Sequence, residues 1–209
     1  YYRPLTLLSF MAERVLHGFN PYYVRLFNVL LHAVNSFLVY RLARLSTSTL
    51  SGALVAAALF AVHPLNAEAV NFNAGGRNTM LATFFVLSSY LVHRWSLKNG
   101  TVAAAWGGAV LFLAGLLSKE TALAILPFVI GAEYAAFRQR DGVSGKQVVF
   151  RLIPYLAAVA VYLALRHNAL SQAGVVLGVL PGLTGRLLDN FYIIPRYLLN
   201  VVWPGMLSP

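Results

Sequence analysis

Long apolar segments, separated by short polar or proline-containing breaks, make up most of this chain. Several of them approach the roughly 20 residues that a helix needs to cross about 30 Å of hydrocarbon. We therefore expect an all-α fold, a polytopic transmembrane helix bundle that forms a single domain over residues 1–209. About six spans are predicted, near residues 22–44, 50–63, 79–95, 101–117, 120–137 and 148–165.

Four further segments flank or connect these spans. Residues 4–17 start with Pro4, which suits the first turn of a helix. They are too short to span, so we predict a helix in the plane of the membrane interface. The polar residues 65–78 predict a loop or a short lateral helix. Residues 167–183, rich in Gly and Leu, predict a loop, and residues 184–203 predict an aromatic helix that is interfacial or spanning.

Composition places the chain in a membrane. Only 11% of its 209 residues are charged and 59% are hydrophobic, whereas a soluble domain carries roughly 25% charged residues. A soluble globular domain is thereby excluded. The absence of cysteine excludes disulfides and thiol chemistry. The net charge of +10 does not indicate nucleic-acid binding, because the sixteen Lys and Arg residues lie at the ends of apolar segments, which suits membrane topology and anionic lipid headgroups.

Basic residues concentrate on one predicted face of the bundle, in the connections at residues 41–49, 93–100 and 138–151. They are Arg41, Arg44, Arg94, Lys98, Arg138, Arg140, Lys146 and Arg151. The positive-inside rule makes this face cytoplasmic. Fewer basic residues are predicted on the opposite face, and these are Arg3, Arg25, Arg77, Lys119, Arg166 and Arg186.

The non-cytoplasmic face holds the residues that could bind an anion. The candidates, each at the end of a span or in a short connection, are Arg3, His63, Glu68, Arg77, Lys119 and Glu120. Cations placed against the topological bias are often retained to hold an anion. A lipid-linked phosphate suits this depth, because its tail lies in the bilayer and its phosphate at the interface. The alternatives are that Lys119 snorkels to the interface, that Arg77 pairs with Glu68 and that Glu120 pairs with Lys119.

Other polar residues have a simpler expected role. Asn28, His32 and Asn35 share one face of the first span. They are expected to hydrogen-bond to neighbouring helices, with a transport path as the alternative. Glu133 is expected to pair with Arg138 or to reach the interface. No second histidine or carboxylate lies at helical ligand spacing beside His63, so no metal site held by this chain is predicted.

Five short motifs in order resemble a known family. They are Tyr2-Arg3-Pro4-Leu5-Thr6, Asn28-Val-Leu-Leu-His32-Ala-Val-Asn35, Phe60-Ala-Val-His63-Pro64-Leu-Asn-Ala-Glu68-Ala-Val, Gly76-Arg77-Asn78 and Leu117-Ser118-Lys119-Glu120. Together with Trp203-Pro204-Gly-Met-Leu207-Ser208, they resemble the membrane part of the transmembrane and tetratricopeptide-repeat-containing proteins. That family is similar to the protein O-mannosyltransferases of the GT-C class, and the resemblance covers essentially the whole chain.

The resemblance implies a GT-C-like fold and a membrane glycosyltransferase. Such an enzyme transfers a sugar from a polyprenyl-phosphate carrier to a protein or lipid acceptor on the non-cytoplasmic face. By the same resemblance, Arg3, Arg77 and Lys119 match positions that hold the donor phosphate. His63 and Glu68, with Glu120, match motif positions in supporting polar roles. The expected location is a bacterial inner membrane with the site facing the periplasm, or the endoplasmic reticulum membrane in a eukaryote.

The chain also departs from the family pattern. The acidic loop that supplies the catalytic base is expected upstream of Tyr2, so no catalytic residue is assigned in this chain, and a divalent metal would belong to the full-length enzyme. Asn78 stands where the family often has Asp. The expectation is a fragment of a longer enzyme, and the alternative is a non-catalytic membrane scaffold subunit that keeps the fold within a larger complex. The sugar, the acceptor and the oligomeric state are not determined by the sequence.

Overall fold

The computed structural model describes residues 2–18, 20–47, 49–72, 75–139 and 144–172, and over these residues the ordered elements are helices. They are α1 (Pro4–His17), α2 (Pro21–Ser46), α3 (Leu50–Val62), α4 (Pro64–Asn71), α5 (Gly76–Asn99), α6 (Val102–Ser118), the 3-10 helix η1 (Glu120–Ile125), α7 (Leu126–Gln139) and α8 (Gly145–Gln172). The all-α prediction is confirmed. The aromatic helix predicted at 184–203, and with it Arg186, lies outside the described residues.

Local sequence signals explain most of the helix boundaries. Proline occupies the first position of α1, α2 and α4, where its missing N–H costs no hydrogen bond. The side chains of Asn20 and Thr49 accept hydrogen bonds from the first turns of α2 and α3. Gly100 ends α5 with a φ of 68°, a left-handed conformation that glycine adopts at little cost.

Two predicted boundaries were wrong. The segment 65–78 contains the lateral helix α4, but its last residues from Gly76 already form the first turn of α5. The span predicted at 148–165 is part of the longer helix α8, so the loop predicted at 167–183 does not begin before residue 173. The bounds predicted at 120–137 agree with the helical segment Glu120–Arg138. This segment starts as a 3-10 helix, because Pro127 cannot donate a hydrogen bond to the turn before it.

Fewer spans than predicted are found when a spanning helix must be both long enough and apolar enough to cross a membrane. Within the described residues, α2, α8 and the segment Glu120–Arg138 are long and apolar enough to cross a membrane, and α3 with α4, bent by 52°, would make a fourth span. The prediction of about six spans is not confirmed. Helix α5 has 24 residues but carries charges near both ends, and α6 has only 17 residues.

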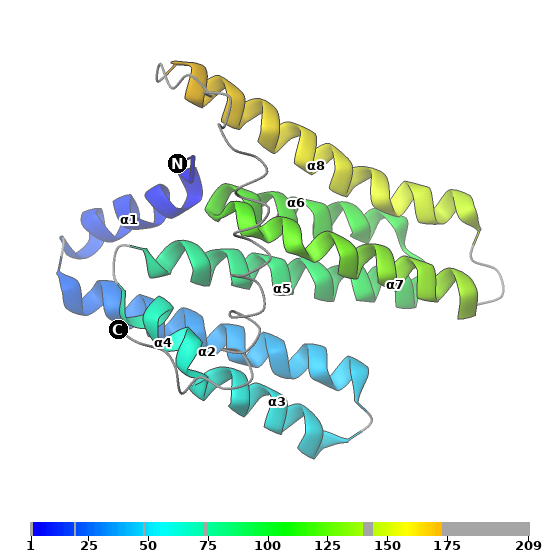
Figure 1. The fold of residues 1–209 in the computed structure, drawn as a ribbon, viewed down its shortest axis with the longest axis horizontal. Coiled ribbons are helices and arrows are strands. Elements are labelled where there is room, and N and C mark those ends of the chain that lie inside the picture. The colour runs from blue at the N-terminus through cyan, green and yellow to red at the C-terminus, as the bar shows by residue number, and fades with distance from the viewer. Residues whose placement is uncertain (1, 19, 48, 73–74, 140–143, 173–209) are drawn as a thin grey trace, which may run out of the picture.

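The helices lie side by side in a layered bundle (Figure 1), with α5 at its centre. It packs on α6 on one side and on α2 on the other, α3 lies against α2, and α8 covers α6. The buried apolar core lies between α6, η1, α7 and α8 and includes Phe112, Leu116, Val129, Tyr155 and Tyr162. The part of the bundle around α5 therefore forms a rigid frame for side chains at either end.

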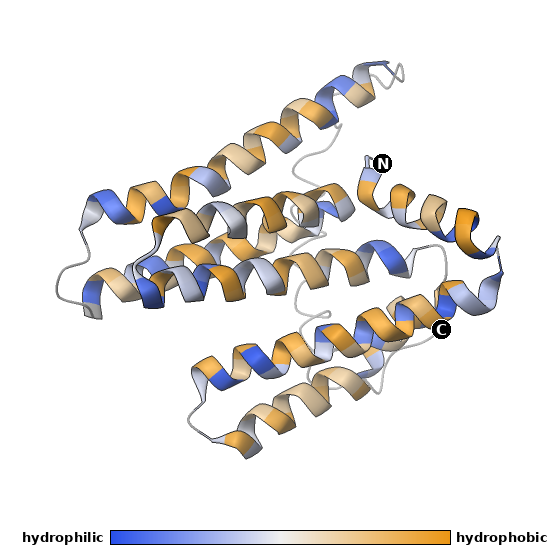
Figure 2. Cartoon of the chain, turned by 180° about the vertical axis from the view of Figure 1, so that it is seen from behind, coloured by the Kyte–Doolittle hydropathy of each residue, from blue (hydrophilic) through white to orange (hydrophobic). Residues whose placement is uncertain are grey.

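Many large apolar side chains of the described helices are exposed, as expected for a protein whose solvent is lipid. Figure 2 shows apolar residues along most of the length of the helices. Helix α1 is the clearest case. Its large apolar residues Leu7, Met11 and Val15 are exposed, whereas its polar residues Thr6 and Glu13 are buried. The polar face of α1 thus points into the protein, and this orientation brings its carboxylate to the site.

Candidate functional site

Hydrogen bonds connect the sequence motifs with one another at one end of the bundle, where α1, α5 and η1 begin and α6 ends. Thr6 Oγ1 donates to the Ser118 carbonyl at 3.2 Å, and Arg77 Nε donates to Asn28 Oδ1 at 3.0 Å. Helix α5 links to the α6–η1 break through Thr79. Segments more than 100 residues apart therefore form one structure at the predicted non-cytoplasmic end.

The first part of this structure, the Glu120 cluster, consists of Arg3, Thr79, Lys119, Glu120 and Arg166. Arg3 forms a forked ion pair with Glu120, with Nη2 at 2.9 Å from Oε1 and Nε at 3.3 Å from Oε2. The charge of Arg166, from α8, also acts on Glu120. Of the alternatives for Glu120, the pairing with Lys119 is not the one formed, because its carboxylate binds Arg3. The cluster sets three cations against one carboxylate, so an excess of positive charge remains.

Lys119 is the cation of this cluster that has no carboxylate partner within the described residues. Its side chain is half-buried at the break between α6 and η1. Its Nζ atom donates one hydrogen bond, to Thr79 Oγ1 at 2.8 Å. An ammonium group has three donors, and the hydroxyl of Thr79 does not neutralise its charge. Lys119 is thus held in place and left with binding capacity for an anion.

The second part, the Arg77 network, consists of Glu13, Asn28 and Arg77, and it is buried. Arg77 is fully inaccessible, and its Nη2 donates to Glu13 Oε1 at 2.8 Å and to the Val24 carbonyl at 3.1 Å. The rings of Phe10 and Phe27 lie at 4.5 and 4.3 Å from its guanidinium carbon. The expected alternative pairing of Arg77 with Glu68 was wrong. This geometry makes Arg77 a tie between α5, α1 and α2, so a direct contact with phosphate stays a prediction.

The polar face of α2 hydrogen-bonds to neighbouring helices, as predicted. Asn28 Nδ2 donates to the Val70 carbonyl of α4 at 3.4 Å, and Asn35 Nδ2 donates to the Met80 carbonyl of α5 at 3.0 Å. His32 Nε2 donates to the Ala61 carbonyl of α3 at 3.0 Å. Each side chain reaches a different helix, so this face fixes how α3, α4 and α5 lie against α2.

His63 and Glu68 lie apart from the Glu120 cluster, on α4 and its start. His63 Nδ1 accepts a hydrogen bond from the Leu65 N–H at 3.3 Å and so caps α4. Glu68 is exposed, and its carboxylate forms no hydrogen bond or ion pair with another described residue. No three His, Cys, Asp or Glu side chains gather within the described residues in a way that could hold a metal ion.

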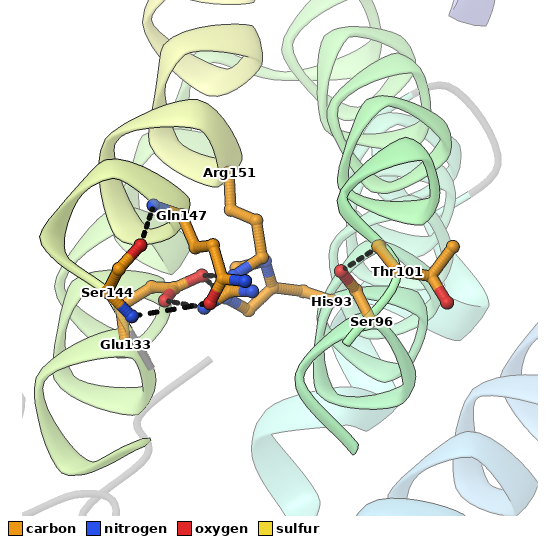
Figure 3. A network of polar contacts seen from close by, with 7 residues as sticks. All are labelled: His93, Ser96, Thr101, Glu133, Ser144, Gln147 and Arg151. Carbon is orange, nitrogen blue, oxygen red and sulfur yellow. Dashed lines mark hydrogen bonds and ion pairs between the residues drawn. The ribbon is translucent and has the colours of Figure 1, made fainter. Parts of the chain in front are cut away.

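The other end of the bundle contains a second buried polar group, the Glu133 triad of His93, Glu133 and Arg151, in which Glu133 and Arg151 form the ion pair (Figure 3). Arg151 binds Glu133 through two hydrogen bonds of 2.7 and 3.1 Å, and His93 Nε2 lies 3.4 Å from Glu133 Oε1. The expected partner Arg138 instead donates to the hydroxyl of Tyr134 at 3.3 Å. The triad joins α5, α7 and α8, so it stabilises the bundle at the predicted cytoplasmic end.

The sequence patterns did not predict the roles of three residues in these networks. They are Glu13, Arg166 and Arg151, the partner of Glu133. Glu13 had a usable signal, because it is the single carboxylate in a helix whose other face is apolar. A charge at such a position in a membrane protein usually faces the protein interior. The pairing of Arg151 had no local signal, because Arg138 and Arg151 follow Glu133 on the same side of the membrane.

These observations define an integral membrane protein with an all-α bundle and ionic networks buried at both ends. The family model described as dolichyl-phosphate-mannose-protein mannosyltransferase matches residues 7–171, and the chain belongs to this family. The resemblance of the five motifs is thereby confirmed.

Several curated relatives are similar to the chain. Protein O-mannosyl-transferase Tmtc2 of Drosophila melanogaster is 33% identical over 99% of this chain and 23% of its own length. Tmtc1 of the same organism is 40% identical over 60% of this chain and 14% of its own length, and human TMTC1 is 36% identical over 59% and 15%. The chain spans less than a quarter of the length of these relatives. No solved structure matches.

Proposed function

We propose that the chain is the donor-binding membrane part of a glycosyltransferase of GT-C type that uses a polyprenyl-phosphate sugar. The donor phosphate binds at the Glu120 cluster, on the periplasmic face of a bacterial inner membrane or the lumenal face of the endoplasmic reticulum. The observation that carries this proposal is Lys119, a half-buried ammonium held by Thr79 and without a carboxylate partner within the described residues.

The chemistry of transfer favours cations at this place. The bond from the sugar anomeric carbon to the phosphate oxygen breaks, and a bond from the same carbon to an acceptor hydroxyl oxygen forms. The hydroxyl proton passes to a base, and the polyprenyl phosphate leaves with one more negative charge than it had in the donor. Fixed positive groups beside the phosphate stabilise this developing charge. Lys119 and Arg3 are suited to that role, because Lys119 directly precedes Glu120 in the chain and Arg3 is ion-paired with Glu120.

The other ionic residues have supporting roles in this proposal. Glu120 holds the Arg3 guanidinium in one orientation through its two hydrogen bonds, which reduces the side-chain entropy lost on binding. Arg77 holds the first turn of α5, on which Thr79 lies, against α1 and α2. Its contribution to donor binding is therefore to position the Thr79–Lys119 pair.

The test is binding of radiolabelled dolichyl-phosphate mannose to the intact protein in nanodiscs. Lys119→Ala and Arg3→Ala are compared with Arg25→Ala, which removes an exposed cation from the first turns of α2. Removal of one charged hydrogen-bond partner is expected to weaken binding about tenfold or more. Arg25→Ala is expected to bind like the wild type.

Wild-type affinity in Lys119→Ala, with the fold preserved, would refute the donor site at the Glu120 cluster. Absence of binding in the intact wild type, under conditions where a related mannosyltransferase binds, would instead support a scaffold subunit without donor chemistry. Thermal unfolding of each variant separates loss of the site from loss of the fold.

A further inference from the structure

A groove of about 690 Å³ lies at the predicted cytoplasmic end of the bundle, far from the Glu120 cluster. Its walls come from the second half of α2, the last turns of α5 and the middle of α7. The lining residues are Phe37, Leu38, Arg41, Leu45, Leu91, Arg94, Trp95, Leu97, Lys98, Ala132, Ala135 and Ala136. Its volume lies in the range of roughly 300–1,000 Å³ that is typical of small-molecule sites.

Among the described residues that line this groove, the charged ones are all positive. They are Arg41, Arg94 and Lys98. Within the described residues, none of the three forms a hydrogen bond or an ion pair. Arg94 is half-buried and Arg41 and Lys98 are exposed, whereas the buried Arg77 and Arg151 each bind a carboxylate. The described residues therefore leave the three cations of the groove available to an anion.

The rest of the lining is apolar and shaped for a chain-like group. Ala132, Ala135 and Ala136 follow the three- and four-residue spacing of one helix face on α7, and their small side chains leave the space open. Leucine and phenylalanine side chains of α2 form the facing wall, and α5 closes the back. Because α2 and the segment Glu120–Arg138 are both candidate spans, this apolar space opens between two lipid-facing helices.

The depth of the groove agrees with a headgroup position. Lys98 lies 21 positions after Arg77 on the same helix, which corresponds to about 31 Å at the helical rise of about 1.5 Å per residue. That is close to the thickness of the hydrocarbon core. Trp95 is exposed at the same end, where tryptophan side chains prefer the membrane interface. The cations thus lie at the level of the phosphates of the opposite leaflet.

We propose that this groove binds an anionic phospholipid of the cytoplasmic leaflet. Arg41, Arg94 and Lys98 hold the headgroup phosphate, and an acyl chain lies along the alanine face of α7. A soluble phosphate compound fits less well, because most of the lining is apolar and faces lipid. The lipid stabilises the packing of α2 and α7 on α5 at the end opposite the proposed donor site.

The test is native mass spectrometry of the intact protein with phosphatidylglycerol or phosphatidylcholine. The variant R41Q/R94Q/K98Q removes the three cations. The control R44Q/R138Q/K146Q removes the same charge from three exposed basic residues at the same end that do not line the groove. We expect tight binding of one phosphatidylglycerol to the wild type and the control. We expect about tenfold weaker binding in the groove variant, because each basic residue near an anionic surface adds to the attraction.

Equal loss of phosphatidylglycerol in the two triple variants would overturn the proposal, because it would indicate a diffuse surface charge effect. Equal binding of phosphatidylcholine by the wild type would also overturn it. If the groove variant does not fold, Ala135→Phe provides the second test, because it fills the groove without changing the charge. It is expected to displace the lipid, and unchanged binding in Ala135→Phe would place the lipid elsewhere. Neither outcome depends on donor binding at the Glu120 cluster.

Discussion

Replacement of Arg77 by alanine is expected to destabilise the bundle far more than the loss of an ordinary hydrogen bond would. The substitution leaves the Glu13 carboxylate, whose side chain is only 11% exposed, without its partner. It also removes the contact with Asn28 and the stacking on the rings of Phe10 and Phe27. Loss of one partner of a buried ion pair costs about 3–5 kcal/mol, since the other charge remains buried.

The size of the loss in unfolding free energy distinguishes the ion pair of Arg77 and Glu13 from the hydrogen bonds around it. Asn28→Ala removes a neutral partner of the same guanidinium, and hydrogen bonds between membrane helices contribute only about 0.6–1.7 kcal/mol. Arg77→Ala should therefore lower the free energy of unfolding at least about twice as much as Asn28→Ala does. Arg25 is an exposed cation one turn from Asn28. Arg25→Ala should change the free energy of unfolding by less than about 0.5 kcal/mol.

The assay is reversible unfolding of the intact protein by SDS in mixed micelles, with helicity as the readout. The double variant E13Q/R77M should recover part of the loss, because it removes both charges together. If Arg77→Ala unfolds like the wild type but no longer binds the donor, then Arg77 is a ligand of the phosphate and the structural role assigned to it is wrong. Strict additivity in the double variant would show that the two charges do not interact.

Two further predictions concern the frame of the bundle. Arg151→Ala should lower the free energy of unfolding by about 3–5 kcal/mol, because Glu133 would stay buried and unpaired. The control Arg138→Ala should change the free energy of unfolding by less than about 0.5 kcal/mol. Equal effects of the two substitutions in chemical denaturation would contradict the pairing of Arg151 with Glu133. Gly108→Ala should cost about 1–3 kcal/mol through overpacking, because its Cβ would overlap the hydroxyl of Tyr155. Tyr155→Phe in the same chain should restore most of this loss, and the absence of any rescue in a thermal melt would place the clash elsewhere.

Hydropathy and capping residues were sufficient to predict the helices themselves. The prediction for residues 4–17 coincides with α1, and the break at Ser118-Lys119-Glu120 separates α6 from η1. These features depend on neighbours within about one helical turn, so a local pattern contains them. The number of spans was harder to predict, because α5 is helical throughout and still carries charges close to both ends.

The partners of the charged residues could not be derived in the same way. Arg3 binds Glu120, 117 positions away, and Arg77 binds Glu13, 64 positions away. In both cases the pairing considered as an alternative was with a nearer residue, Glu68 for Arg77 and Lys119 for Glu120. Which residue becomes the ion-pair partner depends on which helix faces meet, and each face offers several polar residues at the right depth.

The sequence by itself determined that this is a membrane-embedded helical protein, where most of its helices lie along the chain, and which of its predicted ends carries cations against the topological bias. Only the tertiary structure decided that Arg77 is buried as a tie between three helices while Lys119 has no carboxylate partner among the described residues, since both depend on how α1 packs against α5 and α6. The physical reason is that hydrophobicity acts on each residue through its local environment, whereas an ion pair forms only between groups that the packing of distant segments has brought within about 4 Å.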